Sequence, residues 1–156
     1  MTTYGISDER LYVTISDHLI NDALIKTIES SFTKVIFLNK KTDKNWNERN
    51  RFDFQVSLSV WKKFSKNLEY ISFLGIFVDN QFTVEHLNCM RKLKYLQIGG
   101  TEYLLFDGED TSTLPMIQDV VLWGLGVVHM SPKLQEWIDR LRENKCRCDM
   151  YLNNLF

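Results

Sequence analysis

The chain has 156 residues, of which 44% are hydrophobic and 25% charged, so it has the length of one domain and enough apolar side chains for a core. Its 19 basic and 20 acidic residues give a formal net charge of −1, which argues against nucleic acid or an anionic membrane as a partner. No apolar run approaches the roughly 18 residues that span a bilayer, and residues 1–10 resemble neither a signal nor a transit peptide. We therefore expect one domain over residues 1–156, located in the cytoplasm or the nucleus.

Short extended segments recur along the chain, each with two apolar residues separated by one further residue. They begin at residues 13, 35, 71, 96, 120 and 150, so the steps between them are 22, 36, 25, 24 and 30 residues. The six segments are Val13-Thr14-Ile15, Val35-Ile36-Phe37, Ile71-Ser72-Phe73, Leu96-Gln97-Ile98, Val120-Val121-Leu122 and Met150-Tyr151-Leu152. Recurrence at about two dozen residues is typical of stacked structural repeats. The sequence therefore predicts six short strands that lie side by side in chain order.

Amphipathic segments in four of the intervening gaps predict helices. Asp17 is expected to cap a helix that carries Ile20 and reaches residue 28. A second helix is predicted over residues 56–64, and a third from Thr83 to about residue 90. The clearest start is Ser131-Pro132, a capping residue followed by proline at the first helical position.

Two gaps have a different composition. Residues 40–51 are polar and charged except for Trp46, which predicts a surface loop inserted into the repeat. The loop is either a mobile insertion or a binding loop anchored by Trp46. The gap between Ile98 and Val120 contains the turn-forming run 107–113, so we expect an irregular segment there without a full helix.

Residues 68–76, 93–101 and 117–125 resemble the leucine-rich-repeat consensus L-x-x-L-x-L-x-x-N. Their irregular repeat length is similar to that of F-box and cullin-adaptor substrate receptors. The resemblance implies an α/β solenoid with a parallel sheet of about six short strands on the concave side and helices or irregular segments on the convex side. The consensus asparagine is replaced at each repeat, by Lys40, Ile76, Thr101, Leu125 and Leu155. The alternative architecture is an open parallel sheet covered by helices on both faces.

In a solenoid sheet, the residues that alternate with the inward apolar positions line the concave face. The column before each motif is Tyr12, Lys34, Tyr70, Tyr95, Asp119 and Asp149. The central column is Thr14, Ile36, Ser72, Gln97, Val121 and Tyr151, and the column after is Ser16, Leu38, Leu74, Gly99, Trp123 and Asn153. Aromatic side chains are enriched at protein-binding hot spots. The predicted partner-binding residues are therefore Tyr70, Leu74, Tyr95, Gln97, Trp123 and Tyr151; alternatively, these rings cover the edges of the core.

Motifs for catalysis and metal binding are missing from the sequence. It contains no G-x-S-x-G elbow, phosphate-binding glycine loop or H-E-x-x-H pair. Gly99-Gly100 and Gly124 follow predicted strands and are interpreted as tight turns. We expect no catalytic residues, metal or cofactor, and we interpret the three cysteines, Cys89, Cys146 and Cys148, as reduced thiols. The predicted function is a noncatalytic protein-interaction scaffold or adaptor subunit of a larger complex; the alternative is a small α/β enzyme with an unrecognised active site.

The resemblance also bears on the partners. A ubiquitin-ligase substrate adaptor is one role that it implies, although the chain contains no F-box segment. The last motif runs to Phe156 with no helix after it, and an open strand edge favours association. We therefore expect the C-terminal edge to dock on a partner subunit or a second copy, unless Phe156 folds back over that end.

Overall fold

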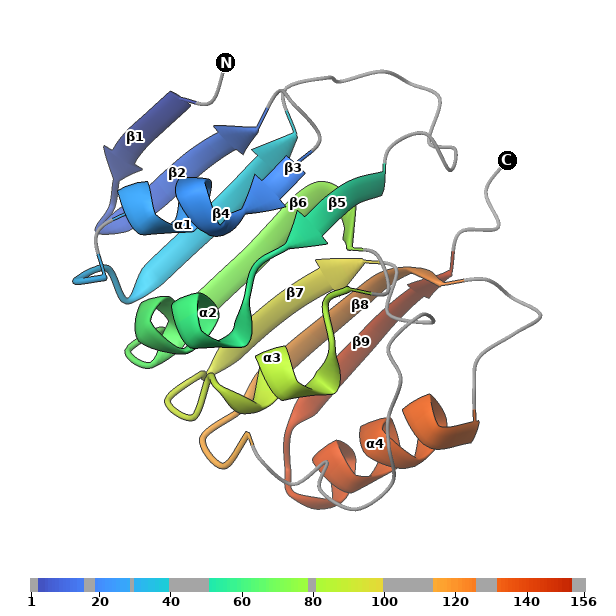
Figure 1. Ribbon diagram of the computed structural model, residues 1–156. Coiled ribbons are helices and arrows are strands. Elements are labelled where there is room, and N and C mark those ends of the chain that lie inside the picture. Colours follow the sequence, from blue (N-terminus) through green and yellow to red (C-terminus); the bar gives the residue numbers. More distant parts are fainter. Residues whose placement is uncertain are drawn as a thin grey trace.

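The computed structural model describes residues 3–15, 19–28, 30–39, 51–78, 81–99, 114–125 and 132–152. Within these ranges the chain forms strands and helices in a mixed order (Figure 1). The strands are β1 (Thr3–Ser7), β2 (Arg10–Ile15), β3 (Leu19–Asn21), β4 (Lys34–Asn39), β5 (Arg51–Gln55), β6 (Tyr70–Val78), β7 (Tyr95–Gly99), β8 (Asp119–Leu125) and β9 (Arg147–Leu152). The helices are α1 (Asp22–Thr27), α2 (Leu58–Ser65), α3 (Val84–Asn88) and α4 (Pro132–Glu143).

The six strands that carry the predicted motifs are neighbours in one sheet. They lie in the order β2-β4-β6-β7-β8-β9 and every adjacent pair is parallel, while β1 adds an antiparallel strand beside β2. The prediction of an α/β protein with a mostly parallel sheet is confirmed. The expected number of about six strands was too low, because β1, β3 and β5 were not predicted.

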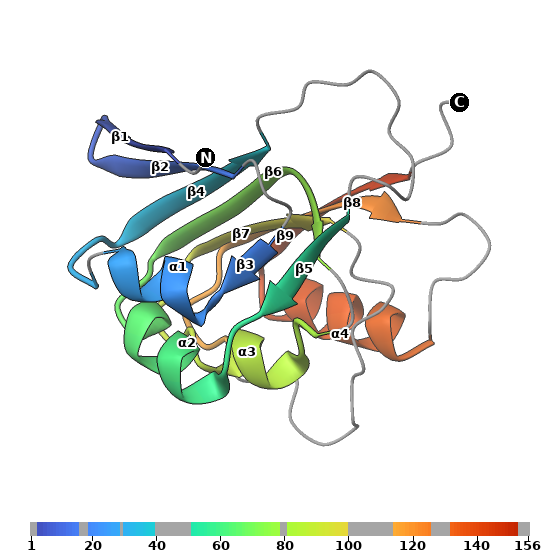
Figure 2. The same cartoon turned by 45° about the horizontal axis from the view of Figure 1, so that its top comes forward.

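The helices lie on one side of this sheet. Figure 2 shows α1, α2, α3 and α4 below the sheet, together with β3 and β5. β3 pairs with β5, and β5 pairs with the end of β6 through Arg51↔Phe77 and Phe52↔Val78, so the sheet divides at β6. The alternative architecture predicted helices on both faces, whereas every described helix covers the same face.

The core lies between the sheet and the helical layer. One row of aligned inward residues crosses the sheet: Leu11, Val35, Ile71, Leu96, Val120 and Cys148, each no more than 7% exposed. In the next row Phe37 and Phe73 stack with ring centroids 5.2 Å apart. Side chains such as Trp61, Leu87 and Ile138 cover these rows from the helices. Burial of continuous apolar rows is the main stabilising contribution to this arrangement.

A turn of the same kind precedes β6, β7 and β8. In each turn the backbone N–H of the fourth residue donates to the carbonyl of the first: Leu68 to Ser65 at 3.1 Å, Leu93 to Met90 at 3.2 Å and Ile117 to Leu114 at 3.3 Å. Leu68 and Leu93 are fully buried, and Ile117 packs against the core. The leucine-type residue three positions before each of these motifs therefore anchors the chain as it enters the strand.

The register at the two ends of the parallel sheet differs from the prediction. Val13 pairs with Phe37, so Leu11 is the residue aligned with Val35. At the other end Cys148 is aligned with Val120, and the predicted marker Met150 is two residues too late. The aligned residues 11, 35, 71, 96, 120 and 148 are separated by 24, 36, 25, 24 and 28 residues, which is more regular than predicted. A shift by two keeps the same face inward, so the apolar pattern alone cannot detect it.

The predicted helices are present, with corrected boundaries. The first begins at Asp22, where the side chain of Asn21 accepts a hydrogen bond from the Leu24 N–H at 2.9 Å, so Asp17 is not its cap. Ile20, predicted to be helical, lies in β3, because pairing with β5 overrides the helical pattern. The helix predicted over residues 56–64 begins at Leu58, and that predicted to reach residue 90 ends at Asn88.

Other predictions are tested only in part. Thr83 is the N-cap of α3 and α4 begins at Pro132, as predicted. Arg51 belongs to β5 rather than to the predicted loop. The rest of that loop, 40–50 with Trp46, and the predicted irregular segment at 100–113 lie outside the described residues.

Candidate binding face

The candidate site is the sheet face opposite the helices, which we call the outer face. Its side chains alternate with the buried rows, and most are half-buried or exposed. They are Arg10, Tyr12, Thr14, Lys34, Ile36, Leu38, Tyr70, Ser72, Leu74, Tyr95, Gln97, Asp119, Val121, Trp123, Arg147, Asp149 and Tyr151. Only Ile36 and Ser72 in this set are fully buried. All six predicted partner-binding residues belong to this face, while the predicted positions 16 and 153 lie outside the described residues.

An aromatic stack crosses the middle of this face. Tyr70 and Tyr95 are paired across β6 and β7, and their rings are parallel within 4° with centroids 4.2 Å apart. Residues paired between adjacent parallel strands are separated by roughly 4.8 Å, so stacking needs no distortion of either strand. The guanidinium carbon of Arg10 lies 4.6 Å from the centroid of Tyr70. Arg10, Tyr70 and Tyr95 therefore form one stack, which combines a cation–π and an aromatic contact.

The phenol of Tyr95 is held in its neutral form. Its hydroxyl donates to Gln97 Oε1 at 2.9 Å, which links two predicted binding residues. Burial raises the pKa of Tyr95 to about 12, assisted by Tyr70 and by the negative charge of Asp119, while Arg10 acts in the opposite direction. The phenol therefore remains a hydrogen-bonding group at physiological pH.

Two ion pairs flank the stack at the beginning of the strands. Lys94 Nζ lies 3.0 Å from Glu69 Oε1, and Arg147 Nε lies 3.7 Å from Asp119 Oδ1. All four side chains are more than one third exposed, so each pair contributes roughly 0–1 kcal/mol. In each pair the carboxylate offsets the positive charge of Lys94 or Arg147, so these two cations are less available to a binding partner.

Trp123 occupies a second part of the face, near the ends of the strands. A Cβ at Gly99 would lie 3.0 Å from Trp123 Cε2 and 3.3 Å from the Ile76 carbonyl. Gly99 is the last residue of β7, so its glycine serves this close approach of the indole rather than the predicted turn. The corrected register places Tyr151, 61% exposed, opposite Trp123. Tyr151 was assigned to the central column, which instead contains Asp149.

The predicted site is thus divided into parts. Tyr70, Tyr95 and Gln97 are in contact near the beginning of the strands, whereas Trp123 and Tyr151 are paired near their ends. Leu74 is paired with Leu38 and lies four residues after Tyr70 on β6. Sequence reasoning missed Arg10, because it assigned Tyr12 to that column. The available signal was Leu11-Tyr12-Val13, which fits the same strand motif two residues earlier.

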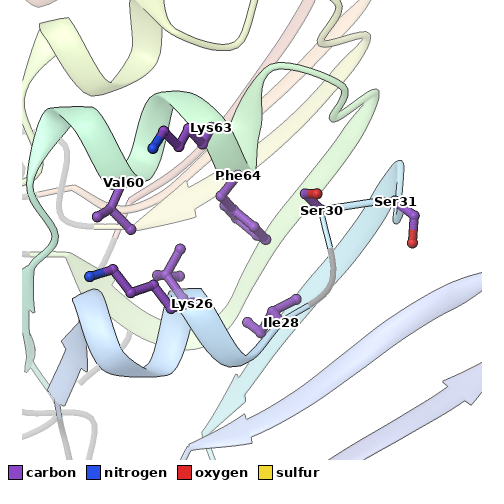
Figure 3. A pocket seen from close by; sticks show the side chains of 8 residues that line it. Lys26, Ile28, Ser30, Ser31, Val60, Lys63 and Phe64 are labelled. Carbon is purple, nitrogen blue, oxygen red and sulfur yellow. The ribbon is translucent and has the colours of Figure 1, made fainter.

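Two hollows lie away from the outer face. A cavity of about 600 Å³ between α1 and α2 is lined by Ile25, Lys26, Ile28, Ser30, Ser31, Val60, Lys63 and Phe64. Figure 3 shows Ile28 and Phe64 pointing into this space, with Lys26 and Lys63 on opposing helices. A second, of about 410 Å³, lies beside β1, where Tyr4 hydroxyl and Thr27 Oγ1 are 2.8 Å apart. Because these linings contain no carboxylate, histidine or cysteine, we favour the outer face as the candidate site.

The one buried histidine of the described chain links three elements. His86 Nε2 donates to the Val56 carbonyl at 2.8 Å, and its Nδ1 accepts from the Thr83 backbone N–H at 3.2 Å. Phe54, Phe82 and Trp61 surround the ring. Burial lowers the pKa of His86, against smaller opposing effects of the Val56 carbonyl and Glu85. Both ring nitrogens are thus occupied by structural hydrogen bonds of the neutral imidazole.

The cysteines are free thiols. Burial raises the pKa of Cys89, Cys146 and Cys148, and that of Cys146 reaches about 12 with further contributions from Cys148. The thiolate, which is the reactive form, is therefore disfavoured at all three positions. Among the described residues, no group of three or more His, Cys, Asp and Glu side chains lies close enough to hold a metal ion.

The C-terminal edge is formed by β9, and residues 153–156, including Phe156, lie outside the described part. The backbone N–H of Arg147 donates to the carbonyl of Gln118, which directly precedes β8. Backbone polar groups of successive strand residues point to opposite sides, so the carbonyl of Cys148 faces away from β8. Arg142 of α4 donates to this carbonyl at 3.0 Å. A charged side chain that occupies a carbonyl of an edge strand opposes pairing of that edge with another chain. Docking at this edge stays a prediction, and any partner there has to accommodate Arg142.

Comparison with protein-family models, with curated proteins and with solved structures finds no match to this chain. In the described ranges, no helix has the length and apolar character required to cross a membrane.

Proposed function

We propose that this chain is a noncatalytic, leucine-rich-repeat-like scaffold that binds a partner protein through its outer face. Three features support a repeat architecture: the parallel order of the six strands, the turn before β6, β7 and β8, and the placement of the described helices on one side. In solenoids of this kind each repeat buries its apolar face against its neighbours, and the sheet forms the binding surface. On this interpretation the outer face is the concave face.

The observation that carries the proposal is the stack of Arg10, Tyr70 and Tyr95 on a sheet face that no described helix covers. Tyr, Trp and Arg are the residues most enriched at binding hot spots, because they combine a large contact area with few rotatable bonds or several donors. The outer face also presents Trp123 beside Tyr151. A partner that covers both groups would bury apolar area and meet defined polar groups such as Gln97.

The chain would then act as an adaptor or subunit of a larger assembly in the cytoplasm or nucleus. A ubiquitin-ligase substrate adaptor is one such role, which follows only from the resemblance of residues 68–76, 93–101 and 117–125 to leucine-rich repeats.

Affinity capture from a cell lysate, followed by mass spectrometry, tests this function. Proteins retained by the wild type should be lost with Tyr95→Ala combined with Trp123→Ala, while a cooperative thermal transition at a lowered midpoint shows that the variant still folds, because Tyr95 stacks on Tyr70 and Trp123 packs against Gly99. Leu58→Ala is the matched control, because Leu58 is 39% exposed and lies on α2 in the helical layer. Unchanged capture by the double variant would contradict the proposal, and loss of folding would assign both residues to the core.

A further inference from the structure

The outer face carries an uneven distribution of charge across its strands. Arg10 on β2 lies beside Lys34 on β4, because the neighbouring residues Leu11 and Val35 are paired. At the opposite end, β9 presents the exposed Asp149. Two further charges of the outer face, Asp119 on β8 and Arg147 on β9, form an ion pair with each other. The face is therefore basic at β2 and β4, and over β8 and β9 it has one excess negative charge, that of Asp149.

The charges of Arg10 on β2 and Lys34 on β4 are not neutralised within the described part of the chain. No carboxylate there forms an ion pair with Arg10 or Lys34, although Asp8 and Glu9 directly precede Arg10 in the hairpin turn. The other cations near this face, Lys94 and Arg147, each have a carboxylate partner.

The guanidinium of Arg10 is also oriented in advance. Its contact with Tyr70, with the guanidinium carbon 4.6 Å from the ring centroid, restricts the position of the group but uses none of its N–H donors in a hydrogen bond. A planar guanidinium with free donors binds a carboxylate through two parallel hydrogen bonds, and its prior orientation reduces the entropy lost on binding. Lys34 adds a second positive charge at the neighbouring position.

From this arrangement we infer that Arg10 and Lys34 form an anion subsite, which binds a carboxylate side chain from an acidic segment of the protein partner. The inference rests on the proposed function and adds the chemistry of the partner. The segment crosses the strands with its acidic part at β2 and β4, and the residues that follow pack on the edges of the Tyr70 and Tyr95 rings. Where the segment reaches Asp149 on β9, it carries a basic residue.

The acidic end of the face favours a protein segment over a nucleic acid. A phosphate backbone has the same charge along its whole length, so a strand laid across the sheet would bring phosphates to Asp149. A protein segment can change the sign of its charge within a few residues, which matches both ends of the outer face.

The test is an NMR titration of the ¹⁵N-labelled full chain with acetylated hexaglutamate at about 0.15 M salt, where long-range effects are screened. Amide shifts should concentrate at residues 10–12, 34–36 and 70, and Arg10→Gln with Lys34→Gln should weaken binding by about tenfold. The matched control is Lys26→Gln with Lys63→Gln, which removes the same charge from the cavity between α1 and α2 and should leave binding unchanged. Titration with hexalysine should instead change the amide chemical shifts of residues near Asp149.

Several results would overturn the inference. Amide shifts concentrated near Lys26 and Lys63, or spread evenly over all basic residues, would mean that hexaglutamate binds only by nonspecific electrostatic attraction. Tighter binding of hexathymidylate at Arg10 and Lys34 would replace the acidic segment by a nucleic acid. If partner capture depends on Tyr95 and Trp123 but not on Arg10 and Lys34, the proposed function stands and the anion subsite is wrong.

Discussion

The two faces of the main sheet are built from alternate residues of the same strands, yet they are chemically different. On the inner face the row from Leu11 to Cys148 contains only buried apolar side chains and cysteine. On the outer face the adjacent positions are mostly half-buried and include Tyr70, Tyr95 and charged groups. The inner face determines which residues form strands and how they align. The outer face is less constrained by packing and can therefore specialise in recognition.

Adjacent residues of β6 provide the strongest test of this comparison. Phe73 is fully buried and stacks on Phe37, whereas Leu74 is half-buried on the outer face. Phe73→Ala should lower the free energy of unfolding by about 3–5 kcal/mol, because it leaves a cavity as well as removing apolar contacts. Leu74→Ala should cost about 1 kcal/mol, since its side chain already contacts solvent. Urea denaturation of both variants measures the difference, and equal losses would refute the division between the faces.

Glycine 99 tests the closeness of packing on the outer face itself. Gly99→Ala places a methyl group 3.0 Å from Trp123 Cε2, and the indole is too rigid to yield without moving as a unit. We expect a loss of about 1–3 kcal/mol in unfolding free energy and a shift in tryptophan fluorescence. Gly5→Ala is the control, because nothing lies within 4 Å of the added Cβ on β1. A neutral Gly99→Ala variant would show that Trp123 does not pack against β7.

The inner face explains which parts of the fold could be predicted from sequence. Val35, Ile71, Leu96 and Val120 are aligned as expected, because burial imposes apolar side chains at every second position. The pairing of Tyr70 with Tyr95 followed from the same alignment. Strands with weaker burial were missed. The side chains of β1 are exposed from Tyr4 onward, and β3 has only three residues and pairs with the distant β5.

The outer face was less predictable for a related reason. The arrangement of its residues depends on their contacts with one another. Those contacts depend on the register between neighbouring strands, which the apolar pattern leaves uncertain by two residues. Cys148 was interpreted only as a thiol, so Met150 was taken as the marker for β9. As a result, Tyr151 was assigned beside Val121 instead of Trp123. The same kind of error at β2 concealed the contact between Arg10 and Tyr70.

His86 is a buried titratable residue of the inner layer, and it makes stability depend on pH. Because burial lowers its pKa below the ordinary 6.5, the neutral form is favoured in the folded protein. Its stabilising contribution is complete above pH 6.5 and is lost as the pH falls through the pKa of the folded state. Over that window the slope is at most about 1.4 kcal/mol per pH unit. Urea denaturation between pH 5 and 8 should show a smaller slope for His86→Gln; because both proteins retain His18 and His129, an unchanged slope would contradict this role.

The smallest expected effects belong to turns outside both faces. Glu9 in the β1–β2 hairpin has φ 64° and Lys145 after α4 has φ 65°, a region that strains side chains other than glycine. Glu9→Gly and Lys145→Gly should each raise the free energy of unfolding by about 0.5–1 kcal/mol, because relief of strain exceeds the entropy gained by the unfolded chain. Lys66→Gly is the control: Lys66 follows α2 with φ −59°, so glycine there should destabilise the protein. Thermal denaturation distinguishes the two signs, and destabilisation by all three substitutions would show that neither turn stores strain.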